Sequence, residues 1–178
     1  MFRKLLNSEL HRMSVEEFKS SGKSSSVAVL DNVRSQHNVG SAFRTCDAFR
    51  INKLYLCGIC ACPPSPEIHK SALGAEFSME WEYWKDTPAL VCRLKKDGYT
   101  IVSVEQAENS TSLQDFRTEP GRKYAFIFGN EVNGVRQDVV DASDVCLEIP
   151  QYGTKHSLNV SVSVGIVLWG ALNMNTIK

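Results

Sequence analysis

Short apolar runs, separated by polar segments that contain glycine or proline, recur along most of this chain. Six runs have the length of buried strands and predict strands at residues 27–30, 54–57, 81–84, 100–104, 124–128 and 145–149. Between them, start signals and helical spacing predict helices over about 38–49, with Asn38 as its N-cap, and over about 68–73, 87–96 and 135–142. Strands that alternate with helices indicate an α/β domain with a mainly parallel sheet flanked by helices.

The N-terminal residues do not follow this alternation. Ser14 and Glu17 have the spacing of a capping box and predict a short helix through Lys19, followed by a polar linker at 20–26. We therefore divide the chain into a short extension at 1–25 and one domain at 26–178.

The C-terminal apolar run is ambiguous. Residues 158–164 alternate apolar and small polar side chains, which indicates a half-buried strand. The run then continues to Trp169, which is too long for an ordinary strand. If the run is instead a helix, Ser157 and Asn159 are both suited to cap its start.

Composition narrows the class of protein. The 178 residues are 43% hydrophobic, which suits one domain with a core of its own. No secretory leader is visible, nor an unbroken apolar span of about 18 residues that a membrane helix needs. Six cysteines without a leader favour a reduced, cytoplasmic protein over a disulfide framework. Because the net charge is zero, a nucleic-acid partner requires a local basic patch.

Polar loops follow three of the predicted strands, at residues 31–40, 129–134 and 150–159. Ligands of parallel sheets bind beyond the carboxyl ends of the strands, so these loops predict a ligand site. The second loop lacks the Gly-x-Gly-x-x-Gly spacing and the P-loop lysine, which argues against a nicotinamide dehydrogenase and a phosphate loop. This loop also contains Glu131, whose carboxylate would repel a phosphate and is suited to accept hydrogen bonds from neutral or cationic groups.

Taken together and in this order, the three loops resemble the SpoU (TrmH-like) family of RNA ribose methyltransferases, part of the SPOUT superfamily. The matching segments are NVRSQHNVGSAFRT at 32–45, IFGNEVNGV at 127–135, and IP followed by SLNVSV within 149–162. About 80 residues separate the first segment from the second, and the resemblance covers about Val27 to Met174.

The resemblance implies a fold and a cofactor that the apolar pattern does not predict. In this family the C-terminal segment is a helix that threads through a loop to make a deep trefoil knot, a rare exception among protein connections. The cofactor is S-adenosylmethionine, bound in the knot mainly by backbone groups. By match, its pocket contains Gly129, Ile149 and Leu158, with Val104 and Glu105 as further candidates.

The resemblance also implies the catalytic residues. By match, Arg44 is the catalytic arginine, and Asn38, Glu131, Ser157 and Asn159 complete the site. Because a guanidinium stays protonated at neutral pH, we expect Arg44 to bind the adjacent phosphate and stabilise a developing alkoxide rather than accept a proton. Asn38 and Asn159 are expected to hold the ribose and Arg44 in place.

The expected partners are RNA and a second copy of the chain. Arg34, Lys155 and His156 are candidate RNA contacts, although solvated loop positions explain Lys155 and His156 equally well. With only about 25 residues before the domain, we expect the catalytic domain itself to bind the tRNA or rRNA. The resemblance implies a homodimer through the knot region, in which both subunits shape each site.

Two other functions stay open at this point. One is methylation of an RNA base on the same scaffold, which nucleoside analysis would distinguish. The other is a non-catalytic RNA-binding module, which would fail to bind S-adenosylmethionine. A metal site is not predicted: Cys57, Cys60, Cys62 and His69 resemble a metal knuckle, but the second pair of ligands is missing.

Overall fold

The computed structural model describes residues 1–172, which contain a seven-stranded sheet whose neighbouring strands are all parallel. The strands lie in the order β3-β2-β1-β6-β4-β7-β5. Their bounds are β1 Val27–Asp31, β2 Lys53–Cys57, β3 Trp81–Trp84, β4 Tyr99–Val104, β5 Thr111–Ser112, β6 Lys123–Phe128 and β7 Val145–Glu148. The six predicted strands are confirmed, whereas β5 was missed because its two polar residues carry no apolar signal.

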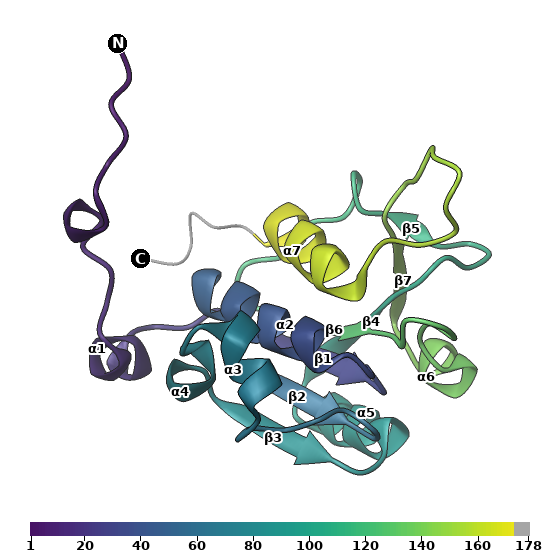
Figure 1. Cartoon of the computed structure of the whole chain (residues 1–178). Helices are drawn as coiled ribbons and strands as arrows, with labels where there is room; N and C mark the ends of the chain where they lie inside the picture. The colour runs from purple at the N-terminus through teal and green to yellow at the C-terminus, as the bar shows by residue number, and fades with distance from the viewer. Residues whose placement is uncertain (173–178) are drawn as a thin grey trace.

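Helices cover both faces of the sheet (Figure 1). On one face α2 packs against α3, α4 and α7, and α1 contacts α4. On the other face α5 packs against α6. The bounds are η1 Asn7–Glu9, α1 Val15–Ser20, α2 Gln36–Ala48, α3 Pro66–Ala72, α4 Ala75–Ser78, α5 Thr87–Lys96, α6 Gln137–Asp141 and α7 Val160–Ala171. Within residues 1–172, no helix has both the length and the apolar character that crossing a membrane requires.

Strand β1 lies in the middle of the core. It pairs with β2 on one side and β6 on the other, and all five of its residues are buried. Ala28 and Leu30 pack in the layer under α2 and α7, whereas Val27 and Val29 pack in the layer under α5 and α6. A strand that is buried on both faces has a continuous apolar sequence, which is why this segment was predictable.

Short polar side chains cap the N-termini of α1, α2, α3 and α5. The side chains of Ser14, Ser35, Ser65 and Asp86 each accept a hydrogen bond from a backbone N–H in the first turn. The capping box of Ser14 is therefore confirmed. The prediction that Asn38 caps the second helix is wrong, because α2 begins at Gln36 and the Asn38 N–H donates to Ser35 Oγ at 3.3 Å. The side chain of Asn38 is consequently available to other loops.

The C-terminal run is the helix α7, although valine and serine are poor helix formers. Val160, Val164 and Val167 are buried at helical spacing, whereas Val162 is 48% exposed. The strand indicated by alternation is therefore wrong, and the helix implied by the family resemblance is confirmed. Burial against α2 and β6 decides between the two, since several valines fit either period. The knotted threading stays a prediction.

The start of α7 corrects one further prediction. Asn159 caps the helix, with its Oδ1 accepting the Ser161 N–H at 2.9 Å. Ser157 is not a second cap, because α7 begins at Val160 and Ser157 lies before its first turn. Its exposed side chain instead borders the pocket described next.

Candidate active site

A pocket of about 340 Å³ opens at the carboxyl edge of the sheet, where β4, β6 and β7 end. This volume is typical of sites for small organic ligands. All five residues predicted to bind the cofactor line it: Val104, Glu105, Gly129, Ile149 and Leu158. Of the three predicted loops, those at 129–134 and 150–159 line the pocket together with the end of β4, whereas none of residues 31–40 lines it.

The loop at residues 129–136, which we call the β6–α6 loop, forms one wall of this pocket. Asn130 and Gly134 exchange two backbone hydrogen bonds of 2.9 Å, and Asn130 Oδ1 also accepts the N–H groups of Val132 and Asn133. This closes a tight turn, and Gly134 has the left-handed φ of 66° that favours glycine. Sequence reasoning missed Asn130, although asparagine at such a turn is a recognised signal.

The charge of the pocket suits a cationic ligand. Its two carboxylates belong to Glu105 and Glu131, and no lysine or arginine occurs among its lining residues within 1–172. Glu105 accepts the N–H groups of Gln106 at 2.8 Å and Val135 at 2.9 Å. An acidic wall with exposed backbone groups disfavours a phosphate and fits a sulfonium next to a neutral adenine. These residues therefore fit S-adenosylmethionine.

Glu131 joins the β6–α6 loop to the start of α2. Its Oε1 accepts the Ser35 N–H at 3.1 Å and the Asn38 Nδ2–H at 3.0 Å, and its Oε2 accepts the Arg34 N–H at 3.0 Å. Partial burial opposes the charge, but the hydrogen bonds from Arg34, Asn38 and Ser35 outweigh it and lower the pKa of Glu131 below its ordinary value. The carboxylate is thus held ionised and is a poor proton acceptor near neutral pH.

Asn38 links this carboxylate to α7. Its Oδ1 accepts a hydrogen bond from Asn159 Nδ2 at 3.1 Å, while its Nδ2 donates to Glu131. Both ends of the Asn38 amide are therefore engaged, which fixes its orientation. Asn38, Glu131 and Asn159, one from each predicted motif, form a continuous chain of hydrogen bonds beside the pocket.

We expect Glu131→Gln to lower the free energy of unfolding by about 1 kcal/mol at pH 7. The side-chain N–H of the new glutamine would face a backbone N–H that now donates to Glu131, and solvent exposure of the site keeps the loss small. The folded-state pKa of Glu131 lies below the unfolded value, so its contribution is present above the unfolded pKa and lost as pH falls through the folded pKa. The difference between wild type and variant should therefore shrink below about pH 4.5, the ordinary value.

Urea unfolding at a series of pH values measures this difference. Glu108→Gln is the matched control, since Glu108 is exposed and its side chain has no hydrogen bond among residues 1–172. If the difference in the free energy of unfolding between wild type and Glu131→Gln stayed unchanged down to pH 3, this would contradict a stabilising role for the ionised Glu131 carboxylate.

Arg44 lies apart from this chain of hydrogen bonds. It follows Asn38 by six residues on α2, about 9 Å along the helix axis, and is exposed. Within residues 1–172 its side chain makes no hydrogen bond or ion pair, and it does not line the pocket. The structure therefore brings Asn38, Glu131, Ser157 and Asn159 together but leaves Arg44 on the outer face of α2.

The three candidate RNA contacts differ in position. Arg34 and Lys155 have exposed side chains, and Arg34 contributes its backbone N–H to Glu131. His156 lines the pocket, where its carbonyl oxygen accepts a hydrogen bond of 2.6 Å from Gln106 Nε2. Gln106 carried no sequence signal, because its partner lies 50 residues away.

The cysteines near His69 do not surround a common point. Within residues 1–172, no group of three or more His, Cys, Asp or Glu side chains is placed to hold a metal ion. Cys60 donates its S–H to the Leu30 carbonyl oxygen, and burial raises its pKa to about 12. His69 instead pairs with Glu76.

The fold and site define a class: a parallel α/β protein that binds a small ligand beyond the carboxyl ends of its central strands. The profile of the SpoU rRNA Methylase family matches residues 25–169. The chain belongs to this family.

This chain is similar to known proteins that are named as tRNA methyltransferases and as rRNA methyltransferases. A tRNA (guanosine(18)-2′-O)-methyltransferase of Aquifex aeolicus is 30% identical over 148 residues, which are 82% of this chain and 67% of that protein. A 23S rRNA (guanosine-2′-O-)-methyltransferase of Nitrosomonas europaea is 33% identical over 141 residues, 79% of this chain and 53% of that protein. The chain thus spans between half and two thirds of these relatives.

The fold itself has solved counterparts. The crystal structure of an AdoMet-bound rRNA methyltransferase from Sinorhizobium meliloti superposes with a TM-score of 0.77 at 24% identity. The match covers 89% of this chain and 60% of that one. The parallel sheet with helices on both faces is therefore the fold of a known methyltransferase.

Proposed function

We propose that this protein transfers a methyl group from S-adenosylmethionine to a ribose 2′-hydroxyl of RNA, either tRNA or rRNA. The observation that carries this proposal is the hydrogen-bonded chain of Asn38, Glu131 and Asn159 at an acidic pocket. Family membership and relatives that are named 2′-O-methyltransferases support it. Free thiols at all six cysteines support a reducing, cytoplasmic location.

The cofactor, when bound, supplies a methyl group on a positively charged sulfur. Glu105 and the backbone of the β6–α6 loop would hold it, and the Glu105 carboxylate would favour its positive charge. Glu131 does not serve as the base, since its oxygens are occupied and its pKa is lowered. It orients Asn38 instead, and Asn38 with Asn159 positions the ribose for in-line attack.

The 2′-oxygen would take the methyl group as the neutral thioether leaves, and its proton would pass to solvent water. Arg44 would supply the positive charge that the oxygen needs as it loses this proton. Its guanidinium binds the phosphate next to the target ribose and stabilises the developing alkoxide. Because Arg44 does not line the pocket of its own chain, each site is completed across a homodimer by the partner subunit's Arg44.

An exposed apolar stripe on α7 supports this homodimer. Val162, Ile166 and Trp169 follow one another at helical spacing, with exposures of 48%, 36% and 69%. Helix α7 packs against α2, which carries Arg44 (Figure 1), and Val160 and Ser163 of α7 line the pocket. An apolar face of this kind next to a ligand site is typical of an interface.

Replacing both Val162 and Ile166 by glutamate is expected to give a folded monomer with little methyl transfer. Two carboxylates on this stripe would have to be desolvated in the dimer. Light scattering measures the mass and a transfer assay the activity. Phe77→Glu, which changes a 60% exposed residue on α4, is the matched control. A double variant that remains dimeric and active would exclude α7 from the interface.

Methyl transfer to unmodified bulk RNA tests the proposed function. The protein is incubated with methyl-labelled S-adenosylmethionine, and the RNA is then digested to nucleosides. Label in a 2′-O-methyl nucleoside is expected, and its distribution between tRNA and rRNA identifies the substrate. Label on a base would instead indicate base methylation, and absence of both label and cofactor binding would indicate a non-catalytic RNA-binding module.

A further inference from the structure

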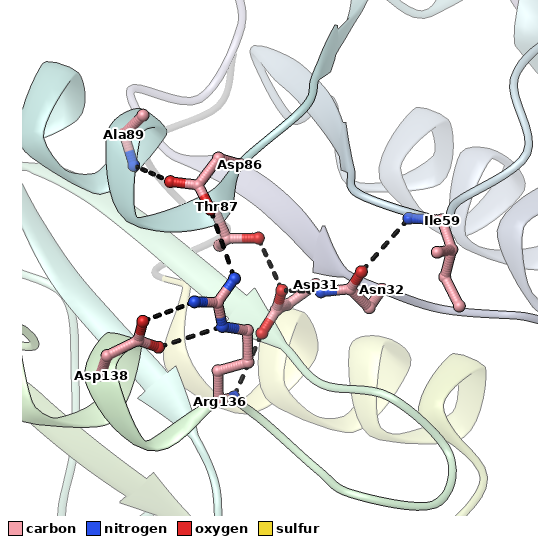
Figure 2. A network of polar contacts seen from close by, with 8 residues as sticks. All are labelled: Asp31, Asn32, Ile59, Asp86, Thr87, Ala89, Arg136 and Asp138. Carbon is pink, nitrogen blue, oxygen red and sulfur yellow. Dashed lines mark hydrogen bonds and ion pairs between the residues drawn. The ribbon is translucent and has the colours of Figure 1, made fainter.

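A second polar cluster lies at the end of β1 (Figure 2). Asp31 is 0% exposed, and its Oδ1 accepts hydrogen bonds from Thr87 Oγ1 at 2.6 Å and Asn32 Nδ2 at 2.8 Å. Its Oδ2 accepts the Arg136 N–H at 3.2 Å. Donors from the β1–α2 connection, the start of α5 and the segment before α6 therefore converge on one buried carboxylate.

These contacts anchor both ends of the β6–α6 loop. At the end of the loop, Asp31 holds the Arg136 N–H directly. Near its beginning, Asn130 Nδ2 donates to the Asn32 carbonyl oxygen at 2.6 Å. Asn32 is in turn fixed by Asp31, and its Oδ1 accepts the Ile59 N–H at 3.2 Å. Asn32 has a φ of 57°; its carbonyl oxygen meets Asn130 of the loop, and its side chain points toward Ile59, just after β2 (Figure 2).

The guanidinium of Arg136 contributes less to this anchoring than its backbone. It pairs with Asp138 at 2.6 Å and with Asp86 at 3.3 Å, but all three side chains are about half exposed. Exposed ion pairs of this kind add little to stability. The hydrogen bond between the Arg136 N–H and the buried carboxylate of Asp31 is therefore the stronger constraint on the end of the loop.

The same loop is held on its other side by the start of α2, through Glu131. Hydrogen bonds thus connect residues 31–38 with residues 130–136 along their length. They involve Asp31, Asn32 and the groups that donate to Glu131. The loop forms a wall of the pocket, whereas Asp31 does not line it. Any effect of Asp31 on a ligand must pass through the loop.

We propose that Asp31 is a positioning residue for cofactor binding, which sets the β6–α6 loop through the Arg136 N–H and Asn32. This inference rests on the proposed function, since it takes S-adenosylmethionine as the ligand of the pocket. Asp31 gives the loop one fixed shape before the ligand arrives, so the cofactor does not bear the cost of ordering it.

Asp31→Asn is the test, because it keeps the volume and removes one acceptor. In either orientation, the new amide directs an N–H at a group that itself donates, either the Arg136 N–H or Asn32 Nδ2. Each of these two groups helps to hold the loop, so either orientation weakens the anchoring of the loop. Calorimetry with S-adenosylhomocysteine, which cannot react, should show a Kd raised roughly tenfold or more. Hydrogen exchange of the amides at 130–136, measured without ligand, should become faster.

Two control variants separate positioning from general loss of stability. Leu54→Ala removes buried volume from the neighbouring strand β2, in the core layer under α2, and within residues 1–172 that layer contains no buried residue of the β6–α6 loop. Thr87→Val removes one donor to Asp31 that belongs to α5 and does not touch the loop. Both are expected to lower the unfolding midpoint while leaving the Kd and the loop exchange near the wild-type values.

An unchanged Kd and unchanged loop exchange in Asp31→Asn would overturn the inference. So would a Kd raised equally by Leu54→Ala at the same loss of stability. If the wild-type protein itself failed to bind S-adenosylhomocysteine, the proposed function would fail. The exchange rates would then still decide whether Asp31 holds the loop.

Discussion

Arg44→Ala is expected to lower the rate of methyl transfer by roughly 100- to 1,000-fold, the usual loss when a charge-stabilising group is removed from a transition state. The Kd of S-adenosylmethionine should stay the same, because Arg44 does not line the pocket. Stability should also be unchanged, since Arg44 is exposed and has no partner among residues 1–172. Single-turnover transfer and calorimetry measure the two quantities separately.

The conservative variant Arg44→Lys tests how the charge acts. Lysine keeps the charge but lacks the planar fork that binds phosphate with two hydrogen bonds, so we expect only partial recovery. Arg93→Ala is the matched control, because Arg93 is an exposed arginine of α5, on the opposite face of the sheet. Near-full activity of Arg44→Ala would refute a catalytic role for this arginine.

Gly129→Ala is expected to weaken cofactor binding by about a hundredfold, which corresponds to about 2.8 kcal/mol. A Cβ at this position would lie 2.1 Å from both Gly134 C and Val135 N. These are backbone atoms of the turn in the β6–α6 loop, so the turn must open and lose the paired hydrogen bonds between Asn130 and Gly134. Calorimetry with S-adenosylhomocysteine measures the loss.

Gly153→Ala is the matched control, since a Cβ at Gly153 would have no neighbour within 4 Å. It lies in the loop before α7 and should bind the cofactor as the wild type does. A Gly129→Ala protein that keeps full affinity would show that the tight turn is not needed for binding.

The two variants together test whether the site is shared between subunits. In a mixed dimer of Arg44→Ala and Gly129→Ala, one pocket is intact and faces a subunit that retains Arg44. If the partner subunit's Arg44 completes each pocket, mixing the two inactive proteins should restore part of the activity. If each site is made within one chain, the mixture should stay inactive.

The sequence by itself determined most of the architecture. Buried strands such as β1 and β6 are continuous apolar runs, and capping residues such as Ser14 and Asp86 act on N–H groups three residues away. Interactions this local can be read from spacing alone. The family resemblance further predicted five of the residues that line the pocket, three of which lie within its short motifs.

Only the tertiary structure decided how these segments work together. The alternation at 158–164 indicated a strand, and burial against α2 and β6 made it the helix α7. Asn38 was predicted as a cap, whereas its amide joins Glu131 and Asn159, 93 and 121 residues away. Asp31 carried no signal at all, since its role depends on the Arg136 N–H, 105 residues further on. Hydrogen bonds between such distant residues form only after the sheet has brought the carboxyl ends of its strands to one edge, and no local pattern encodes them.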